Sequence, residues 1–267
     1  MAPPKAPRKR TGAAPEGCTS FGVTGKLTAN RLPLAGQNKD TVSESLGLYI
    51  VLRLRMTGGP TILVLAYPGE VLGYGLWSTG MSLFRNALYS REEAAGGLSF
   101  VQWGLLALAS GSVPEAAELA QRHGIAQCGN CLITDAAGRS ACVEFNAGGV
   151  SILPARDGLS VHANHPEGEK TAPLELCPSP TIAEHSRNRA ARLRELLELH
   201  RGRLTPESAL AALADHSRRP LGICRHAEDD PEELATTAAI LAEPAKGILH
   251  VVRGQPCQGK AVVYRVA

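Results

Sequence analysis

The order of strand-like and helix-like segments restricts the fold of this chain more than any other feature. Apolar strand-like segments come first, two helical segments follow, and strands, helices and strands then succeed one another in groups. A parallel sheet would require single strands and helices in regular alternation, which the sequence lacks. The grouping predicts an α+β fold in which sheets pack on each other and helices cover the outside.

Short apolar runs bounded by turn residues give the predicted strands. Residues 46–67 form a predicted hairpin, because Thr57-Gly58-Gly59-Pro60 separates two apolar runs. Residues 72–84 contain three Gly and predict two short strands around a tight turn. The remaining predicted strands cover residues 18–30, 130–135, 141–146, 149–154, 235–242, 247–253 and 260–266.

Four segments are predicted to be helical. Residues 99–110 are almost continuously apolar and suit a buried helix, and residues 114–123 begin with Pro in the first turn. Thr205 is the expected N-cap of a helix over 206–215. In the fourth helix, 183–200, the leucines are assigned to the buried side. The exposed side is assigned to Arg189, Arg192, Arg194 and Glu195.

Composition excludes several classes of function. The net charge of +3 is too small to indicate a nucleic-acid partner, and the lack of any apolar run of 18 residues excludes a membrane-spanning helix. The seven Cys are an odd number, and no secretory signal precedes them. We therefore expect mostly reduced thiols and a cytoplasmic protein.

The chain divides into two parts at its beginning. Residues 1–17 are rich in Pro, Ala, Lys and Arg and nearly lack large apolar side chains. They are predicted to be either a disordered N-terminal segment or a short propeptide. Residues 18–267 are predicted to form one folded domain.

Cys18 is the first candidate for chemistry, because it follows Gly17 at the start of a predicted strand. If the chain cut itself before Cys18, the freed α-amino group would have a pKa of about 7.7–8.0 and could accept the thiol proton near neutral pH. Gly17 has no side chain to block attack on its carbonyl. The alternative is that Cys18 is only a small buried apolar residue.

Three further polar residues are candidate partners of this cysteine. Asp40 follows Asn38 in a short polar motif, Asn164 lies in a turn-rich segment, and Arg225 precedes an acidic run. An Asn amide donates hydrogen bonds without titrating and suits a developing oxyanion. Two of them also have a simpler interpretation: Asn164 as a turn former, and Arg225 as half of a surface ion pair.

A zinc-stabilised binding protein is the alternative from a different class. Cys128 and Cys131 have the residue types of a zinc site, and His162 and His165 could complete it. The spacing of the two histidines is tighter than in most structural zinc sites. If there is no zinc site, we expect the two cysteines to be small core residues and the two histidines to be loop residues hydrogen-bonded to the backbone.

Several motifs in sequence order resemble those of the isopenicillin N acyltransferase family, penicillin acyltransferase-like cysteine hydrolases of the N-terminal nucleophile class. The resemblance covers nearly all of residues 17–267. Gly17-Cys18-Thr19-Ser20 is similar to the self-cleavage site of the family, and Gly36-Gln37-Asn38 with Asp40 is similar to its second motif. The other matching segments are Gly73–Asn86, His162-Ala163-Asn164-His165, His185 through Arg189, Asp215-His216, Ile223-Cys224-Arg225 and Gly254-Gln255-Pro256-Cys257.

The resemblance implies that residues 18–267 form a catalytic domain with a four-layer αββα sandwich, and that the chain is cleaved between Gly17 and Cys18. It implies Cys18 as nucleophile and base, Asp40 as the residue that orients the α-amine, Asn164 at the oxyanion and Arg225 as a supporting charge. The family usually carries a longer segment before the nucleophile, so pairing with a separate N-terminal α segment is an open alternative. Lys39, Trp77 and Ala163 depart from the family pattern, and we expect all three near the acyl-binding site.

The sequence therefore predicts a self-processing cysteine acyltransferase or amidohydrolase that forms an acyl-enzyme thioester. A small-molecule amide or acyl thioester is the expected donor, with an amine or water as acceptor and no metal or cofactor. The alternatives are an amidase of the penicillin V acylase or bile-salt hydrolase kind and a degenerate, uncleaved member of the family.

Overall fold

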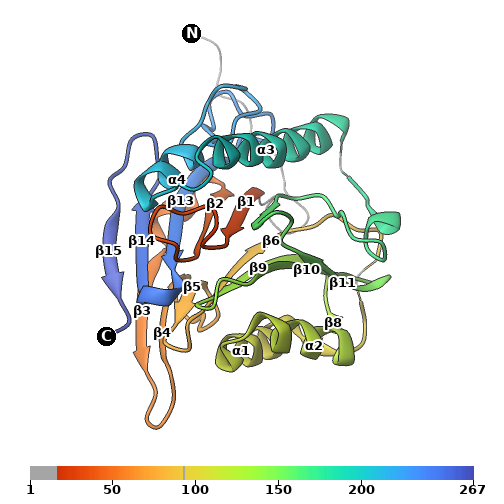
Figure 1. Ribbon diagram of the computed structural model, residues 1–267. Helices are drawn as coiled ribbons and strands as arrows, with labels where there is room; N and C mark the ends of the chain where they lie inside the picture. Colours follow the sequence, from red (N-terminus) through yellow and green to blue (C-terminus); the bar gives the residue numbers. More distant parts are fainter. Residues whose placement is uncertain (1–16, 93, 178) are drawn as a thin grey trace.

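Two antiparallel β-sheets lie face to face in the computed structural model, and a pair of helices covers the outer side of each sheet (Figure 1). The structure describes residues 17–92, 94–177 and 179–267. The predicted four-layer αββα sandwich is confirmed. The predicted tail or propeptide falls on residues 1–16, outside the described part, and on Gly17.

The six-stranded sheet carries most of the segments that the sequence analysis singled out. All of its adjacent strands are antiparallel. The strands lie in the order β12 (Leu159–His162), β1 (Gly17–Val23), β2 (Leu34–Thr41), β13 (Ala235–Glu243), β14 (Ile248–Arg253) and β15 (Val262–Arg265).

The seven-stranded sheet forms the other inner layer. Its strands are antiparallel and lie in the order β11 (Gly149–Pro154), β10 (Ser140–Asn146), β9 (Gly129–Asp135), β6 (Met81–Asn86), β5 (Tyr74–Trp77), β4 (Thr61–Ala66) and β3 (Ile50–Arg55). A short parallel pair, β7 (Leu98–Ser99) and β8 (Ile125–Ala126), lies beside α1.

The helices begin at the capping residues that the sequence provides. α1 (Phe100–Ser110) has a capping box between Ser99 and Gln102, and α2 (Val113–His123) follows it closely. α3 (Pro180–Leu199) begins three residues before its predicted start, because the Ser179 side chain accepts a hydrogen bond from the backbone of Ile182. α4 (Pro206–Leu213) starts after the predicted cap Thr205. Short 3-10 helices occupy Ser43–Gly47, Ala172–Leu174 and Pro244–Lys246.

Three apolar clusters fill the three spaces between the four layers. One lies between the α1–α2 pair and the seven-stranded sheet and contains Trp103 and Phe145. A second lies between the sheets around Phe84 and Ile240. The third joins α3 and α4 to the six-stranded sheet through side chains that include Phe21, Leu193 and Leu197. Among the described residues, no helix combines the length and the apolar character needed to cross a membrane.

The sequence analysis was wrong about the strands nearest the N-terminus. The predicted strand 18–30 ends at Val23, where Thr24 begins a turn closed by a hydrogen bond from Leu27. β2 was not predicted, because its polar run Gln37-Asn38-Lys39-Asp40 does not have the pattern of a strand. All four of these side chains are nevertheless buried.

Candidate active site

Strands β1 and β2 place the two predicted motifs side by side. Gly17 pairs with Asp40 and Cys18 with Lys39 in the antiparallel register. The Asn38 amide donates to the carbonyls of Leu213 (2.8 Å) and Ile223 (3.2 Å). The polar strand β2 is therefore tied to the end of α4 and to the segment that carries Arg225.

Cys18 lies in the buried interior and forms no disulfide. Its backbone nitrogen donates to Oδ1 of Asn164 at 2.9 Å. Two residues along β1, the Ser20 hydroxyl donates to Asn86 of β6, so this face of β1 points toward the other sheet. The nitrogen that donates to Asn164 is the one that cleavage would convert into an α-amine.

Asn164 follows β12, and both the nitrogen and the oxygen of its side-chain amide form hydrogen bonds. Its nitrogen donates to the carbonyl of Ala87 at 2.8 Å, and its own backbone N–H donates to the Ser186 hydroxyl at 2.8 Å. An amide nitrogen carries two N–H groups, so one of them is not used by Ala87. The oxygen accepts from Cys18 and from Arg189, which fixes its orientation toward the start of β1.

Arg189 is the main residue of the site that the sequence analysis missed. Its guanidinium donates to the carbonyl of Cys18 (2.7 Å), to the Thr19 hydroxyl (2.6 Å) and to Asn164 (2.8 Å). The assignment of Arg189 to the exposed side of its helix is wrong, because the residue is 2% exposed. It precedes Leu193 by one turn, and that spacing was the signal available in the sequence.

Asp40 lies between two buried arginines. One carboxylate oxygen accepts from the Thr236 hydroxyl at 2.7 Å, and the other lies 3.7 Å from Arg189 and 4.0 Å from Arg225. Complete burial raises the pKa of Asp40, while both arginines and the Thr236 hydrogen bond act in the opposite direction. Burial and the charge of Arg225 lower the pKa of Arg189, which remains a cation because guanidinium is so weakly acidic.

Arg225 is a buried residue, so its interpretation as half of a surface ion pair is wrong. Its Nε donates to Asp230 at 2.6 Å and its Nη2 to Glu232 at 2.8 Å. Burial alone would lower the pKa of Arg225, but these carboxylates and Asp40 raise it. Asp230 is the last residue of the acidic run that follows Arg225, and Glu232 lies two residues further along the chain.

Gly17 lies directly against this cluster. A Cβ atom at Gly17 would overlap a guanidinium nitrogen of Arg225 and would lie 3.2 Å from Oδ2 of Asp40. The position accepts glycine because there is no room for a side chain. The residue before the predicted cleavage bond therefore lies next to two charged groups, Asp40 and Arg225.

A second buried charge pair supports the loop that carries Asn164. Nε2 of His162 lies 2.6 Å from Glu144, and Nδ1 faces the carbonyl of Ala163 at 2.9 Å. Burial alone would lower the pKa of His162, but the hydrogen bond and charge of Glu144 raise it overall. Glu144 also accepts from the backbone of Glu167 (2.8 Å) and Gly168 (2.9 Å), so it holds both ends of the loop.

The predicted zinc ligands do not form a cluster. Cys131 points into the apolar cluster under α1 and α2, whereas His162 bonds Glu144 on the opposite face of the seven-stranded sheet. Cys128 donates to the carbonyl of Leu88, and His165 bonds Ser186. The zinc hypothesis for these four residues is wrong, because alternation along β9 and β10 separates them.

The departures from the family pattern lie in different environments. Trp77 packs in the cluster under α1 and α2, and Ala163 packs against the α3 side. Lys39 is buried with its ammonium group 5.4 Å from the ring centre of Tyr74. The three residues therefore do not share one environment, and the expectation that they lie near the acyl-binding site stays a prediction.

A small pocket opens next to the residues that contact β1 and Asn164. It has a volume of about 180 Å³ and is lined in part by Asn86 and Ala87. The rings of Phe100 and Phe145 and the backbone of Gly129 form other parts of its wall. This lining is mixed, with apolar rings on one side and amide groups on the other.

The fold is that of the N-terminal nucleophile hydrolases, and solved structures share it. A mutant of conjugated bile acid hydrolase from Clostridium perfringens gives a TM-score of 0.62 at 14% identity, covering 93% of this chain and 96% of that one. Penicillin V acylase from Agrobacterium tumefaciens gives 0.58 at 15% identity, covering 88% and 83%. An N-acylethanolamine-hydrolyzing acid amidase ortholog from Caenorhabditis elegans gives 0.54 at 13% identity, covering 85% and 93%.

The sequence itself establishes the family. The family described as acyl-coenzyme A:6-aminopenicillanic acid acyl-transferase matches residues 27–258, so the chain belongs to that family. A comparison with curated proteins found no significant match. The resemblance noted from the motifs is confirmed.

Proposed function

We propose that this chain is an N-terminal cysteine amidohydrolase or acyltransferase that becomes active by cutting the bond between Gly17 and Cys18. The observation that carries the proposal is the hydrogen bond from the Cys18 nitrogen to Asn164, within reach of Arg189. A side-chain acceptor for the backbone nitrogen of the nucleophile is what an α-amino group would need after cleavage. Family membership supports acyl transfer as the reaction class.

Self-cleavage begins with attack of the Cys18 thiol on the carbonyl carbon of Gly17. The C–N bond to Cys18 breaks, a thioester forms, and the nitrogen gains a proton to become the α-amine. Water then hydrolyses the thioester and releases residues 1–17 as a carboxylic acid. The Arg225 cation lies against Gly17, which supports a role for it in stabilising the charge that develops on the Gly17 carbonyl oxygen.

In each catalytic cycle the thiol of Cys18 then attacks the carbonyl carbon of a separate acyl donor in the same way. The α-amine accepts the thiol proton, the thiolate attacks the donor carbonyl, and the leaving amine or thiol takes the proton. Water or an amine resolves the thioester on Cys18 and gives hydrolysis or acyl transfer. Arg189 holds the Cys18 carbonyl and Asn164 in place, so it is a positioning residue rather than the nucleophile.

The pocket beside Asn86 and Ala87 is the proposed binding site of the acyl group. Its aromatic wall suits an aryl or short alkyl chain, and its volume of about 180 Å³ favours small acyl groups. The relatives with this fold include proteins named as penicillin V acylase and bile acid hydrolase, which supports an amide as donor. An acyl thioester is the second donor class to test, because the family is named for one.

Trapping the acyl-enzyme tests the proposal. The purified chain is incubated with small aryl-acyl and alkyl-acyl amides and thioesters, quenched in acid, and mapped by peptide mass spectrometry. We expect the acyl mass on Cys18, its disappearance in Cys18→Ala, and its persistence in Cys177→Ser as a matched thiol control. Release to hydroxylamine in competition with water separates transferase from hydrolase activity.

The result that overturns the proposal is turnover that survives Cys18→Ala, or acyl groups that label other cysteines equally. A chain that stays uncut and labels nowhere would identify the degenerate alternative. Cys18→Ser gives a further check, because a hydroxyl is harder to deprotonate than a thiol. We expect it to cut slowly and to lose most turnover.

A further inference from the structure

Four side chains with metal-binding atoms meet near the C-terminal part of the chain, outside the proposed active site. His216 follows α4, Cys224 and His226 precede β13, and Cys257 follows β14. One ligand atom from each residue lies within 4.8 Å of all the others. Within residues 17–92, 94–177 and 179–267, no other group of three or more such side chains comes together.

The distances between these atoms match a tetrahedral zinc site. With Zn–S bonds of about 2.3 Å and Zn–N bonds of about 2.0–2.1 Å, ideal tetrahedral edges are about 3.8 Å for S–S, about 3.6 Å for S–N and about 3.3 Å for N–N. The two Sγ atoms lie 3.7 Å apart, Cys257 Sγ lies 3.5 Å from His226 Nε2, and the two Nε2 atoms lie 3.0 Å apart. The remaining contact to His226, from Cys224 Sγ, is 3.9 Å.

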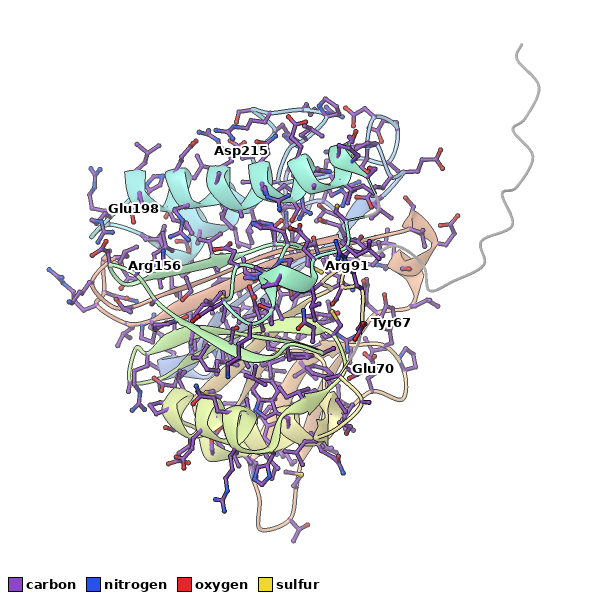
Figure 2. The ribbon with its side chains drawn as sticks, turned by 90° about the vertical axis from the view of Figure 1, so that its right-hand side faces the viewer. Tyr67, Glu70, Arg91, Arg156, Glu198 and Asp215 are labelled. Carbon is purple, nitrogen blue, oxygen red and sulfur yellow. The ribbon has the colours of Figure 1, made fainter. Side chains whose placement is uncertain are left out.

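The backbone holds the ligands in place through bonds of its own. The N–H of Cys224 donates to the carbonyl of Asp215 at 3.1 Å, which brings His216 next to Cys224. Cys257 lies in a turn closed by hydrogen bonds from Gln258 and Gly259 to Gln255. Figure 2 labels Asp215, the neighbour of His216, at the outer side of α3, where its carboxylate accepts from Arg192 at 3.0 Å.

The burial of the four residues fits a structural rather than a catalytic metal. Cys224 and His226 are buried, His216 is partly buried, and Cys257 is exposed. Two thiols and two imidazoles complete a four-coordinate shell and leave no open position for a substrate. The cluster also has a direct link to the proposed active site, because Arg225 lies between two of its members.

We propose that His216, Cys224, His226 and Cys257 bind one zinc ion that joins three separate segments and fixes the position of Arg225. Binding takes the protons from both thiols and uses the neutral form of both histidines. The site is independent of the proposed acyl chemistry, so either conclusion can fail without the other. It differs from the rejected set of Cys128, Cys131, His162 and His165 in all four ligands.

Metal content tests the site directly. The full chain is expressed in zinc-supplemented medium, dialysed against metal-free buffer, and analysed by inductively coupled plasma mass spectrometry. We expect about one zinc ion per chain, the number that a single closed four-ligand shell holds. Cys257→Ser and His216→Ala should each lose it, while the matched control Cys177→Ser keeps it.

Cobalt exchange gives a second readout, and its main sample is the wild-type chain, which carries no destabilising substitution. Co²⁺ bound to the metal-depleted wild-type chain should give the absorption of a tetrahedral thiolate complex, absent with Cys257→Ser. Zinc below a tenth of an equivalent in the wild type, or zinc that the two ligand variants retain, would overturn the proposal. A Cys224–Cys257 disulfide found in the freshly purified protein by non-reducing peptide mapping would also overturn it.

Discussion

The two outer layers of the molecule have the same architecture and opposite chemistry. α1 and α2 cover one sheet with apolar side chains, among them Phe100, Trp103 and Leu108. α3 covers the other sheet with leucines in its second half, but its first half buries Arg189, His185 and Ser186. All three helices bury one side against a sheet, yet only α3 buries a charged side chain there.

The difference indicates that the α1–α2 layer mainly stabilises the fold, whereas the α3 layer also supports the candidate active site. Burial of apolar surface stabilises the α1 layer, whereas burial of a guanidinium is costly unless its donors are all paired. The polar α3 layer meets the polar strand β2, and each supplies partners for the other through Asp40 and Arg189. Burial lowers the pKa of His185 to about 2, so this neighbour adds no charge to the cluster.

Arg189→Leu replaces the buried charge of the α3 layer by an apolar side chain like those of the α1 layer. It should have the largest effect on turnover of the variants that perturb these layers. It removes the donors to Cys18, Thr19 and Asn164, so we expect turnover to fall by about 10²–10³-fold, as for loss of one oxyanion-hole donor. The free energy of unfolding should fall by about 1.5–3 kcal/mol, the range for hydrogen bonds of charged groups. Steady-state kinetics and urea denaturation measure the two effects.

A purely structural role for Arg189 predicts a different result. The loss would then lie in stability alone, with unchanged kcat in the folded fraction. Arg189→Lys keeps the charge but not the planar fork, so we expect it to recover only part of the lost turnover. Equal kcat in all three proteins would contradict the positioning role.

Trp103→Ala perturbs the apolar layer in the same way and should affect stability only. Trp103 is fully buried, and its indole donates to the carbonyl of Ala116 at 3.0 Å. The free energy of unfolding should fall by about 3–5 kcal/mol, the range for removing a large buried side chain. Denaturant titration measures it, and kcat of the remaining folded enzyme should stay within a factor of two. A large fall in kcat would show that the two layers are coupled.

The pair His162 and Glu144 gives a pH-dependent test of the polar region. The pKa of His162 is raised in the folded state, so its contribution to stability is complete below about 6.5, the ordinary value for His, and is lost as pH rises through the raised value. The pKa of Glu144 is lowered, so its contribution is lost as pH falls through that lowered value. Unfolding by urea at several pH values should show the difference between wild type and His162→Gln shrinking from about pH 6.5 upward. A difference that grows with pH would contradict this assignment.

Arg187→Ala is the matched control for Arg189 and should have the smallest effect. Arg187 lies on the same helix, but its side chain is 49% exposed and pairs with Glu175 at 2.8 Å. Exposed pairs of this kind contribute about 0–1 kcal/mol. Thermal unfolding should therefore change little, and turnover should be unchanged. A loss comparable to that of Arg189→Leu would show that helix position, not burial, decides the effect.

Much of the fold could be predicted because local patterns agree with it. The hairpin of β3 and β4, the helices α1 and α2, and the strands β9 to β11 all follow apolar periodicity and turn residues. β2 could not be predicted in this way, because its Gln, Asn, Lys and Asp are buried by partners from distant segments. Such partners belong to tertiary structure, which a local pattern does not contain.

The residues of the candidate site also separate into those that local motifs could predict and those that they could not. Cys18, Asp40, Asn164 and Arg225 were named from motifs, and the fold brings them together, although their roles remain predictions. Arg189 was placed on the wrong side of its helix because charge was taken as a sign of exposure. Its spacing of four residues from Leu193 was the better guide. The cluster around Cys224 was not predicted because its fourth member, Cys257, lies 33 residues after Cys224 and reaches the cluster only through the fold.

The central claim is that Cys18 becomes the N-terminal residue, and intact mass with N-terminal sequencing tests it most directly. The account predicts that the purified wild-type chain begins at Cys18 and that Cys18→Ala remains whole, folded and uncut. A wild-type chain that still begins at Met1 or Ala2, or a Cys18→Ala chain cut at the same bond, would contradict it.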